Sequence, residues 1–263
     1  MLNLLKNINT KRVEISIVGL GYVGLPLCLR FINKGFKVTG IEKDLNKIKK
    51  LKNFESYISS VKSKEIRKAF SLNFKITNSF KFISKSDVII VCVPTPIKSN
   101  KVPEMKHISD TAKKLTKYIK KEQTLILEST VYPGATEEFF LPIIEKKGFI
   151  IGENFFLGYS PEREDPGNNK YSIFKGNIPK VVAGYTNNCK KIVKTLYSSI
   201  SKIFPVSSIK TAEFTKLLEN VYRSINIGFI NEMKIISSKM GINIHECISA
   251  AKTKPFGFQA FYP

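Results

Sequence analysis

Short apolar runs alternate with longer amphipathic segments along most of the chain. Eight runs of four to six residues have the composition typical of strands, at residues 13–18, 37–41, 74–77, 88–93, 124–128, 155–159, 180–183 and 203–206. Between most of them, apolar residues recur at helical spacing. Because such alternation places helices between parallel strands, we predict an α/β fold with a doubly wound parallel sheet.

The pattern changes after residue 207. From Lys210 to about Met240 the chain has no proline and one glycine, Gly228, which predicts a single helix of roughly 45 Å at about 1.5 Å per residue. Its apolar positions lie on more than one face: Phe214, Leu217, Leu218, Val221, Ile225, Phe229, Ile230, Met233 and Ile236. This width favours burial against both domains or against another subunit.

A shorter helix is predicted at about residues 243–251, followed by a turn-rich segment at 254–258. We therefore predict two domains. Residues 1–207 form the sheet domain, and residues 208–263 form a small helical domain that begins with the long helix.

Lysine and arginine number 43 against 21 acidic residues, a formal net charge of +22. This excess is compatible with nucleic acid, an anionic membrane or an acidic ligand. Only five of the basic residues are arginines, however, and the lysines are spread along the chain. Their densest group, Lys113, Lys114, Lys117, Lys120 and Lys121, accompanies apolar residues at helical spacing, so we interpret it as a solvated helix face. We expect only weak, unspecific, salt-sensitive nucleic-acid binding.

The longest apolar stretch, residues 88–93, is too short to cross a bilayer, and residues 1–12 lack a signal-peptide core. These features predict a soluble, cytoplasmic protein without a membrane partner. The four cysteines, Cys28, Cys92, Cys189 and Cys247, are far apart and form no CxxC pair. Their spacing argues against a zinc site or a disulfide framework, so we predict no metal, and Cys28 and Cys92 are interpreted as core residues.

A glycine-rich motif, Gly19-Leu20-Gly21-Tyr22-Val23-Gly24, lies between the first predicted strand and the first amphipathic segment. In this context the glycines permit a tight turn, close approach of the backbone to a pyrophosphate, and packing of helix on strand. The helix N-terminus then faces the anion. The motif predicts a dinucleotide-binding Rossmann domain, although a glycine turn without a ligand is the alternative.

Two further segments fit a cofactor site. Glu42 lies 21 residues after Gly21, at the end of the second strand, where a carboxylate accepts hydrogen bonds from the adenosine ribose. Its charge would repel a 2′-phosphate, which favours NAD over NADP; Lys43 weakens this preference without reversing it. Pro94 and Thr95 end a predicted strand at the carboxyl edge of the sheet, where ligands bind, but alone they indicate only a rigid turn.

Three polar clusters are not explained by periodicity. They are ESTVYPG at residues 128–134, YSPEREDPG at 159–167, and the pair Lys216 and Asn220 on the long helix. Lys216 and Asn220 are four residues apart and share a helix face. By spacing alone this pair is equally well an ordinary polar stripe.

These clusters, with the strings GLGYVGLPL, EFTKLLENVYRSINIGFINE and AAKTKPFGFQAFYP, resemble the UDP-glucose/GDP-mannose dehydrogenase family over essentially the whole chain. The likeness is greatest to bacterial UDP-N-acetylglucosamine and UDP-N-acetylmannosamine 6-dehydrogenases. The resemblance implies oxidation of a sugar C6 alcohol to a carboxylate in two NAD-dependent hydride transfers, through an aldehyde, a cysteine-bound thiohemiacetal and a thioester. It also implies a homodimer formed through the long helix.

The resemblance also implies roles for individual residues. Thr130 would hold a water near the nicotinamide, and Glu162 would act in acid/base chemistry and thioester hydrolysis. Lys216 and Asn220 would bind the oxygen at C6 and stabilise its negative charge. Glu42 stands where the family usually has aspartate, which keeps the charge and lengthens the reach by one methylene.

One departure concerns the nucleophile. The family continues past the FYP segment into a glycine-rich loop with the catalytic cysteine and then into a third, UDP-binding domain, whereas this sequence stops at Pro263. None of the four cysteines matches that nucleophile, so we expect these 263 residues to bind NAD at most weakly and not to complete the oxidation. The prediction is the N-terminal portion of a UDP-sugar 6-dehydrogenase, with an inactive dinucleotide-binding remnant, or a subunit needing a partner chain, as the alternative.

Overall fold

The computed structural model describes residues 1–163 and 178–263 of the chain. The chain forms two compact units, Met1–Phe214 and Thr215–Pro263.

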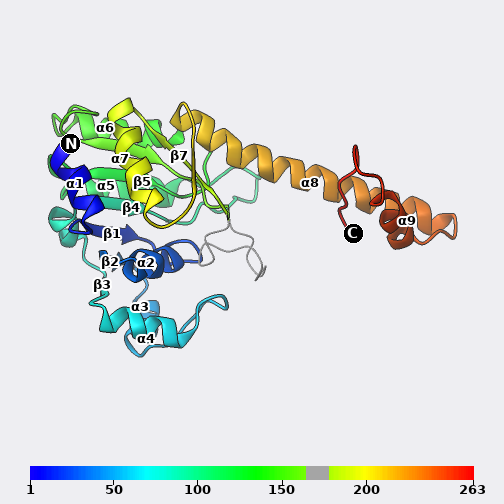
Figure 1. Cartoon of the computed structure of the whole chain (residues 1–263), viewed down its shortest axis with the longest axis horizontal. Coiled ribbons are helices and arrows are strands. Elements are labelled where there is room, and N and C mark those ends of the chain that lie inside the picture. The colour runs from blue at the N-terminus through cyan, green and yellow to red at the C-terminus, as the bar shows by residue number, and fades with distance from the viewer. Residues whose placement is uncertain (164–177) are drawn as a thin grey trace. The chain divides into compact units, whose positions relative to one another are not determined.

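The first unit contains a central sheet. In the described residues it has eight strands, in the order β3-β2-β1-β4-β5-β6-β7-β8. Figure 1 shows β3, β2, β1, β4 and β5 in that order. Their bounds are β1 Glu14–Val18, β2 Lys37–Ile41, β3 Lys75–Thr77, β4 Val88–Val91, β5 Thr124–Leu127, β6 Phe156–Tyr159, β7 Lys180–Gly184 and β8 Ile203–Pro205. All eight apolar runs are strands, and the predicted doubly wound α/β fold is confirmed.

The sheet is parallel except at one pair. Strands β3 to β6 are parallel along the sheet order, but β7 pairs antiparallel with β6, and β8 then runs parallel to β7. Apolar periodicity determines which side chains are buried but not the direction of a strand. A parallel crossover usually needs an amphipathic helix, and the sequence between β6 and β7 carries prolines, glycines and charges instead.

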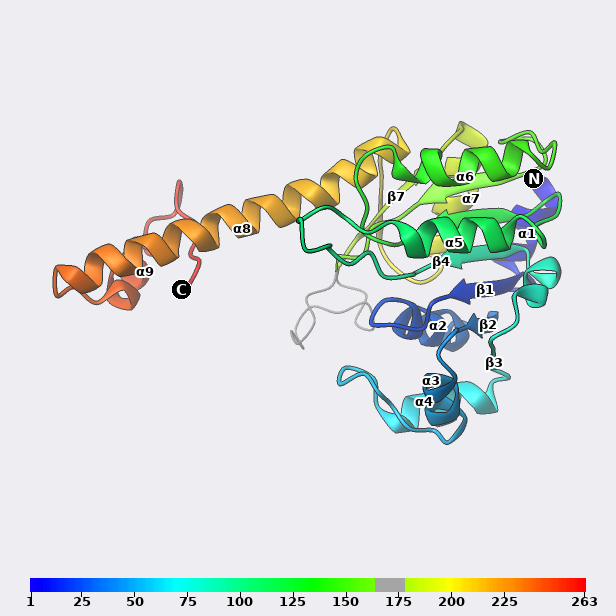
Figure 2. The same cartoon turned by 180° about the vertical axis from the view of Figure 1, so that it is seen from behind.

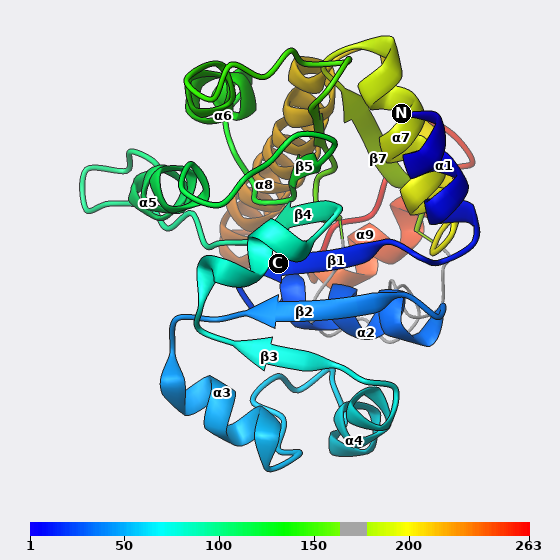
Figure 3. The same cartoon turned by 90° about the vertical axis from the view of Figure 1, so that its left-hand side faces the viewer.

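Helices cover both faces of the sheet (Figure 3). They are α1 Leu2–Asn9, α2 Gly24–Asn33, α3 Leu45–Lys52, α4 Ser63–Ser71, the 3₁₀ helix η1 Phe80–Lys85, α5 Lys106–Leu115, α6 Ala135–Glu145 and α7 Asn187–Ser198. Helices α1, α2 and α7 pack on one face, and α5 and α6 lie on the other (Figure 2). Successive strand residues therefore enter opposite cores: Ile17 and Ile90 belong to one, and Val18 and Val91 to the other. Cys28 and Cys92 are buried in the first core, as predicted.

The strand register aligns the carboxyl ends of the central strands. Val18 lies opposite both Ile41 and Val91. Leu127 lies opposite both Val91 and Tyr159. The residues that follow these strands therefore emerge at one edge of the sheet: Gly19, Glu42, Cys92, Glu128 and Ser160.

The predicted long helix is confirmed as α8, Ile209–Lys239, a continuous helix of 31 residues. It begins in the first unit and continues into the second, where α9, Ile244–Ala251, follows it. No helix in the described ranges combines the length and apolar character needed to cross a membrane.

Candidate functional site

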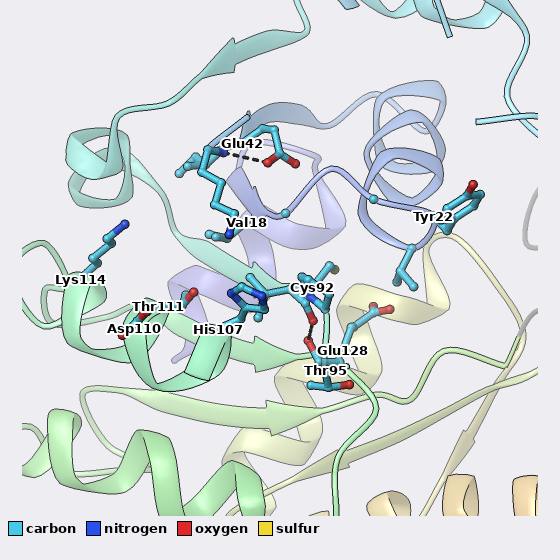
Figure 4. Close-up of a pocket in the computed structure, with 18 of the residues that line it drawn as sticks. Val18, Tyr22, Glu42, Cys92, Thr95, His107, Asp110, Thr111, Lys114 and Glu128 are labelled. Atoms are coloured by element: carbon cyan, nitrogen blue, oxygen red, sulfur yellow. Dashed lines mark hydrogen bonds between the residues drawn. The ribbon is translucent and has the colours of Figure 1, made fainter. Parts of the chain in front are cut away.

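A pocket of about 490 Å³ opens at the carboxyl edge of the sheet in the first unit (Figure 4). Eight of the residues predicted from the sequence line it: Gly19, Gly21, Tyr22, Val23, Glu42, Pro94, Thr95 and Thr130. Segments far apart in the chain thus meet because the strand ends are in register.

The three motif glycines serve different physical purposes. Gly19 has a φ of +91°, and a Cβ there would lie 2.7 Å from the Cys92 carbonyl oxygen. A Cβ on Gly24 would lie 1.9 Å from the Gly19 carbonyl oxygen, so glycine at this position allows the backbone of the turn to pack closely. Gly24 does not line the pocket. A Cβ on Gly21 would meet nothing within 4 Å. Gly21 therefore leaves open space at the pocket wall, just before the N-terminus of α2.

Glu42 forms one end of the pocket and is only 6% exposed. Its Oε2 accepts a hydrogen bond from the Leu20 backbone N–H at 2.9 Å, and its Oε1 accepts from the N–H groups of Lys43 and Asp44 at 2.8 and 3.1 Å. The carboxylate therefore links the end of β2 to the glycine turn. Each carboxylate oxygen has two lone pairs, so Oε1 is fully used and Oε2 can accept one further hydrogen bond, from a ligand hydroxyl.

The loop that carries Thr130 is held by hydrogen bonds from neighbouring segments. The Thr95 hydroxyl donates to the Thr130 carbonyl oxygen at 2.8 Å, and the Ser129 hydroxyl donates to that of Val93 at 2.6 Å. The Tyr159 hydroxyl donates to the Ser129 carbonyl oxygen at 3.3 Å. Thr130 itself is exposed to the pocket.

Glu213, in the first turns of α8, fixes the other end of this loop. Its fully buried carboxylate accepts hydrogen bonds from the Gly134 and Thr136 backbone N–H groups, at 2.5 and 2.9 Å, and from the Thr136 hydroxyl at 2.6 Å. It thereby caps the N-terminus of α6. The sequence analysis missed Glu213 because its partners are 77 and 79 residues away.

The interpretation of the lysine group as a solvated face needs one correction. All five lysines are exposed, but Lys114 also lines the pocket with His107, Asp110 and Thr111 of α5. Its ammonium lies 5.4 Å from the centre of the Phe80 ring. Helical periodicity identifies the residues that face water, but it does not show which of these face a concave surface.

A buried charged cluster lies at the pocket end opposite Glu42, and we call Glu128, Lys180 and Glu162 the acidic cluster. Lys180 Nζ is 2.9 Å from Glu128 Oε2 and 3.8 Å from Glu162 Oε2. The Tyr197 hydroxyl donates to the other Glu128 oxygen. These residues come from the end of β5, the start of β7, the segment after β6, and α7. Glu128 and Lys180 are 0% and 3% exposed, and Glu128 lines the pocket.

The electrostatics of the acidic cluster hold Lys180 in its charged form. Burial opposes this charge, but the carboxylates of Glu128 and Glu162 raise the pKa of Lys180 above its usual value. The sequence analysis missed Lys180 and Tyr197. A lysine at the start of an apolar strand resembles an ordinary strand-end residue, and Tyr197 resembles an ordinary core aromatic.

The remaining predicted residues lie in three places. Glu162 belongs to the acidic cluster, while residues 164–167 of the same motif lie outside the described residues. Lys216 and Asn220 are on α8 in the second unit, where the Asn220 Oδ1 accepts a hydrogen bond from Arg223. The roles of Thr130, Glu162, Lys216 and Asn220 stay predictions.

Two parts of the chain match two domains of one known protein family. Residues 13–201 match the NAD binding domain of the UDP-glucose/GDP-mannose dehydrogenase family, and residues 210–263 match the central domain of the same family.

Individual relatives agree. The chain is 40% identical to Protein CapL of Staphylococcus aureus over 253 residues, and 39% identical to UDP-N-acetyl-D-glucosamine 6-dehydrogenase of Pseudomonas aeruginosa over 256 residues. These matches cover 95% and 96% of this chain but only 58% and 59% of the relatives. The structure of UDP-N-acetyl-mannosamine dehydrogenase Cap5O from Staphylococcus aureus matches with a TM-score of 0.83 at 30% identity, covering 93% of this chain and 60% of that one. The chain thus spans a little over half the length of these relatives.

The surroundings of the motif glycines predict that two similar substitutions differ strongly in their effect on stability. Gly24→Ala should lower the free energy of unfolding by at least about 2 kcal/mol, because its Cβ would overlap backbone that cannot easily move. Gly21→Ala should stay within about 0.5 kcal/mol of wild type, because its Cβ enters open space. Urea unfolding followed by circular dichroism measures both. Equal losses in the two variants would contradict this account of the turn.

The acidic cluster predicts a pH-dependent cost of removing Lys180. Lys180→Met should destabilise the chain by about 3–5 kcal/mol at neutral pH, because it leaves Glu128 buried without its cation. Burial raises the pKa of Glu128, and Lys180 opposes this effect. A carboxyl whose pKa is raised on folding contributes stability below its unfolded pKa, near 4.5, and loses it as the pH rises. The destabilisation caused by Lys180→Met should therefore become smaller as the pH falls from neutral towards about 4.5.

Glu128→Gln is the matched partner for this test. The double variant Glu128→Gln, Lys180→Met should recover much of the stability that Lys180→Met loses, because no unpaired carboxylate is left at that position. A Lys180→Met cost that is independent of pH, or that the second substitution does not reduce, would show that the lysine matters only for packing.

Proposed function

Because this chain belongs to the UDP-glucose/GDP-mannose dehydrogenase family, we propose that it supplies the NAD-binding and central parts of a nucleotide-sugar 6-dehydrogenase. The observation that supports this most is the single pocket that joins the glycine turn, Glu42 and Thr130. The reaction proposed is oxidation of the C6 alcohol of a UDP-sugar to the uronic acid. Relatives named for UDP-N-acetyl-D-glucosamine and UDP-N-acetyl-D-mannosamine favour a UDP-N-acetylhexosamine, with UDP-glucose as the alternative.

The residues present fit NAD. Gly21 offers a surface without a side chain where the backbone can approach a pyrophosphate, and the N-terminus of α2 follows it. Glu42 retains one acceptor position, on Oε2, for a hydroxyl of the adenosine ribose. NAD, when bound, supplies the hydride acceptor for the oxidation.

The opposite end of the pocket would serve the chemistry. We assign Thr130 to holding a water beside the nicotinamide, with its loop fixed by Thr95 and Ser129. Glu162 would take and return a proton at the C6 oxygen or at that water. Lys180, 3.8 Å from Glu162, would restrict where the carboxylate points.

Lys216 and Asn220 are assigned to the sugar by their match to the family motif on the long helix. An ammonium and an amide one helical turn apart are both hydrogen-bond donors, and both suit an oxygen that gains negative charge. The covalent step that the family implies needs a cysteine with no counterpart in these 263 residues. We assign that step to the part of the relatives that this chain does not match.

Cofactor binding is tested by the Gly21→Ala variant. We expect it to fold with wild-type stability but to lose affinity for NAD at least about tenfold, because its Cβ occupies the space that the pyrophosphate would approach. Chemical-shift titration with NAD measures affinities that are weak. Gly228→Ala is the matched control, because a Cβ at this position of α8 would also meet nothing within 4 Å.

Wild-type binding of NAD that Gly228→Ala keeps and Gly21→Ala loses would support the assignment. No detectable NAD binding by the wild-type chain, or equal binding by all three chains, would contradict it.

We also propose that two copies of the chain associate through the second unit. On α8, Leu218, Ile225 and Phe229 are 57%, 65% and 57% exposed, an unusual density of water-exposed apolar side chains for one helix. An interface between two copies would remove these side chains from water and would account for the apolar positions on more than one face of the helix.

Sedimentation tests this association. We expect the wild-type chain to sediment as a dimer and Ile225→Glu to shift it towards monomer, because a charge would then be buried at the contact. Ser238→Glu, at an exposed polar position of the same helix, should leave the dimer intact. A wild-type monomer at all concentrations would contradict the proposal.

A further inference from the structure

Glu213 connects the beginning of α8 to the loop that carries Thr130. We call residues 129–134, between β5 and α6, the Thr130 loop. Glu213 belongs to the first unit, and its carboxylate accepts one hydrogen bond at Oε2, from the Gly134 N–H, and two at Oε1, from the N–H and the hydroxyl of Thr136. Both oxygens must therefore act as acceptors, which suits an ionised carboxylate and not a carboxylic acid or an amide.

The two ends of the Thr130 loop are attached to different parts of the first unit. At its beginning, hydrogen bonds of the Ser129 and Thr95 hydroxyls join it to the segment that follows β4. In its middle, the buried side chain of Val131 belongs to the same core as the first turn of α8. At its end, Glu213 supplies the acceptors described above. The position of Thr130 therefore depends on α8 as well as on β4.

The Thr130 loop borders the end of the pocket that is far from Glu42. Glu42 lies at one end, and Thr95, which is bound to the loop, lies at the other (Figure 4). In a doubly wound sheet of this order, a dinucleotide places its adenosine ribose at the end of β2 and its pyrophosphate at the glycine turn. Its nicotinamide half is then directed towards the ends of β4 and β5, where the Thr130 loop begins.

We propose that Glu213 is a positioning residue for the nicotinamide half of the cofactor. This role rests on the cofactor site proposed above and adds to it a residue that does not line the pocket. Glu213 acts through the backbone of the Thr130 loop. Its hydrogen bonds keep Thr130 at the pocket wall, and their loss leaves the end of the loop less restrained, so that contacts with the nicotinamide half weaken. The adenosine half lies at Glu42 and does not depend on this loop.

A role in stability alone explains Glu213 less well. A helix is usually capped by a side chain of its own N-cap residue, but the N-cap of α6 is Gly134, which has a φ of +98° and no side chain. The acceptor comes instead from 79 residues further along the chain. Burial raises the pKa of Glu213 and so opposes the ionised form that capping requires, a cost that an exposed local cap would avoid. The remote acceptor links two distant segments, which a local cap cannot do.

The test compares the affinity of the chain for NAD with its affinity for ADP. ADP contains the adenosine and both phosphates of NAD but lacks the second ribose and the nicotinamide, so its binding depends on the Glu42 end and the glycine turn. Chemical-shift titrations with each ligand, at one pH and one ionic strength, give the ratio of the two dissociation constants.

The variant for this test is Glu213→Gln, because an amide has one acceptor oxygen and cannot serve Gly134 and Thr136 together. We expect it to weaken NAD binding about fivefold, which corresponds to the loss of one hydrogen bond. ADP binding should stay within about twofold of wild type, because the adenosine end of the site is unchanged.

Thr136→Val is the matched control. It removes the hydroxyl that donates to Glu213 but keeps both backbone N–H donors, so the end of the loop stays attached. We expect this variant to lower the free energy of unfolding, because the buried carboxylate loses a partner, and to leave both dissociation constants at their wild-type values.

Three results would overturn the proposal while leaving the cofactor site intact. Glu213→Gln could bind both ligands as wild type does, it could lose affinity for both equally, or Thr136→Val could change the ratio as much. If Glu213→Gln does not fold, Glu213→Asp decides, because it keeps the charge but is one methylene too short to hold both segments, and the same selective loss is expected. Failure of the wild-type chain to bind NAD would instead refute the proposed function.

Discussion

The common carboxyl edge of the central strands is the constraint on which the rest of the site depends. Val18, Ile41, Val91 and Leu127 are paired in register, so the residues that follow them emerge side by side from a rigid sheet buried on both faces. A shift of one residue would exchange the two cores and move every loop. The loops need few contacts of their own, because backbone pairing has already brought residues from positions 19 to 160 together.

Hydrogen bonds between these loops then fix the conformation of the backbone that lines the pocket. The Glu42 carboxylate ties the glycine turn to β2, Ser129 and Thr95 join the loops after β4 and β5, and Glu213 attaches α8 to the N-terminus of α6. Most of these bonds join a side chain to a backbone group. They therefore fix the path of the chain while leaving its side chains, Thr130 among them, available to the pocket.

The features that were predictable from the sequence are those encoded locally. The strands and the long helix follow from the spacing of apolar residues within each element, and the turn follows from the spacing of its glycines. The direction of β7 was not encoded locally, and neither was the pairing of Lys180 with Glu128, which lie 52 residues apart. In the sequence Lys180 has only apolar neighbours along its strand, and nothing in that context distinguishes a buried ion pair from an exposed strand end. Likewise, the spacing of Lys114 indicates a helix surface but not the pocket that this surface borders.

The charges of the chain act at two ranges. The formal net charge of +22 comes mainly from exposed lysines, whose field is screened over about 8–10 Å in physiological salt. Such a field raises the local concentration of any anionic ligand and has little power to choose between similar ones. The buried carboxylates have the opposite properties, since they reach only the groups beside them but are little screened. A dinucleotide would therefore be attracted by the surface charge, whereas the groups that line the pocket would distinguish it from other anions.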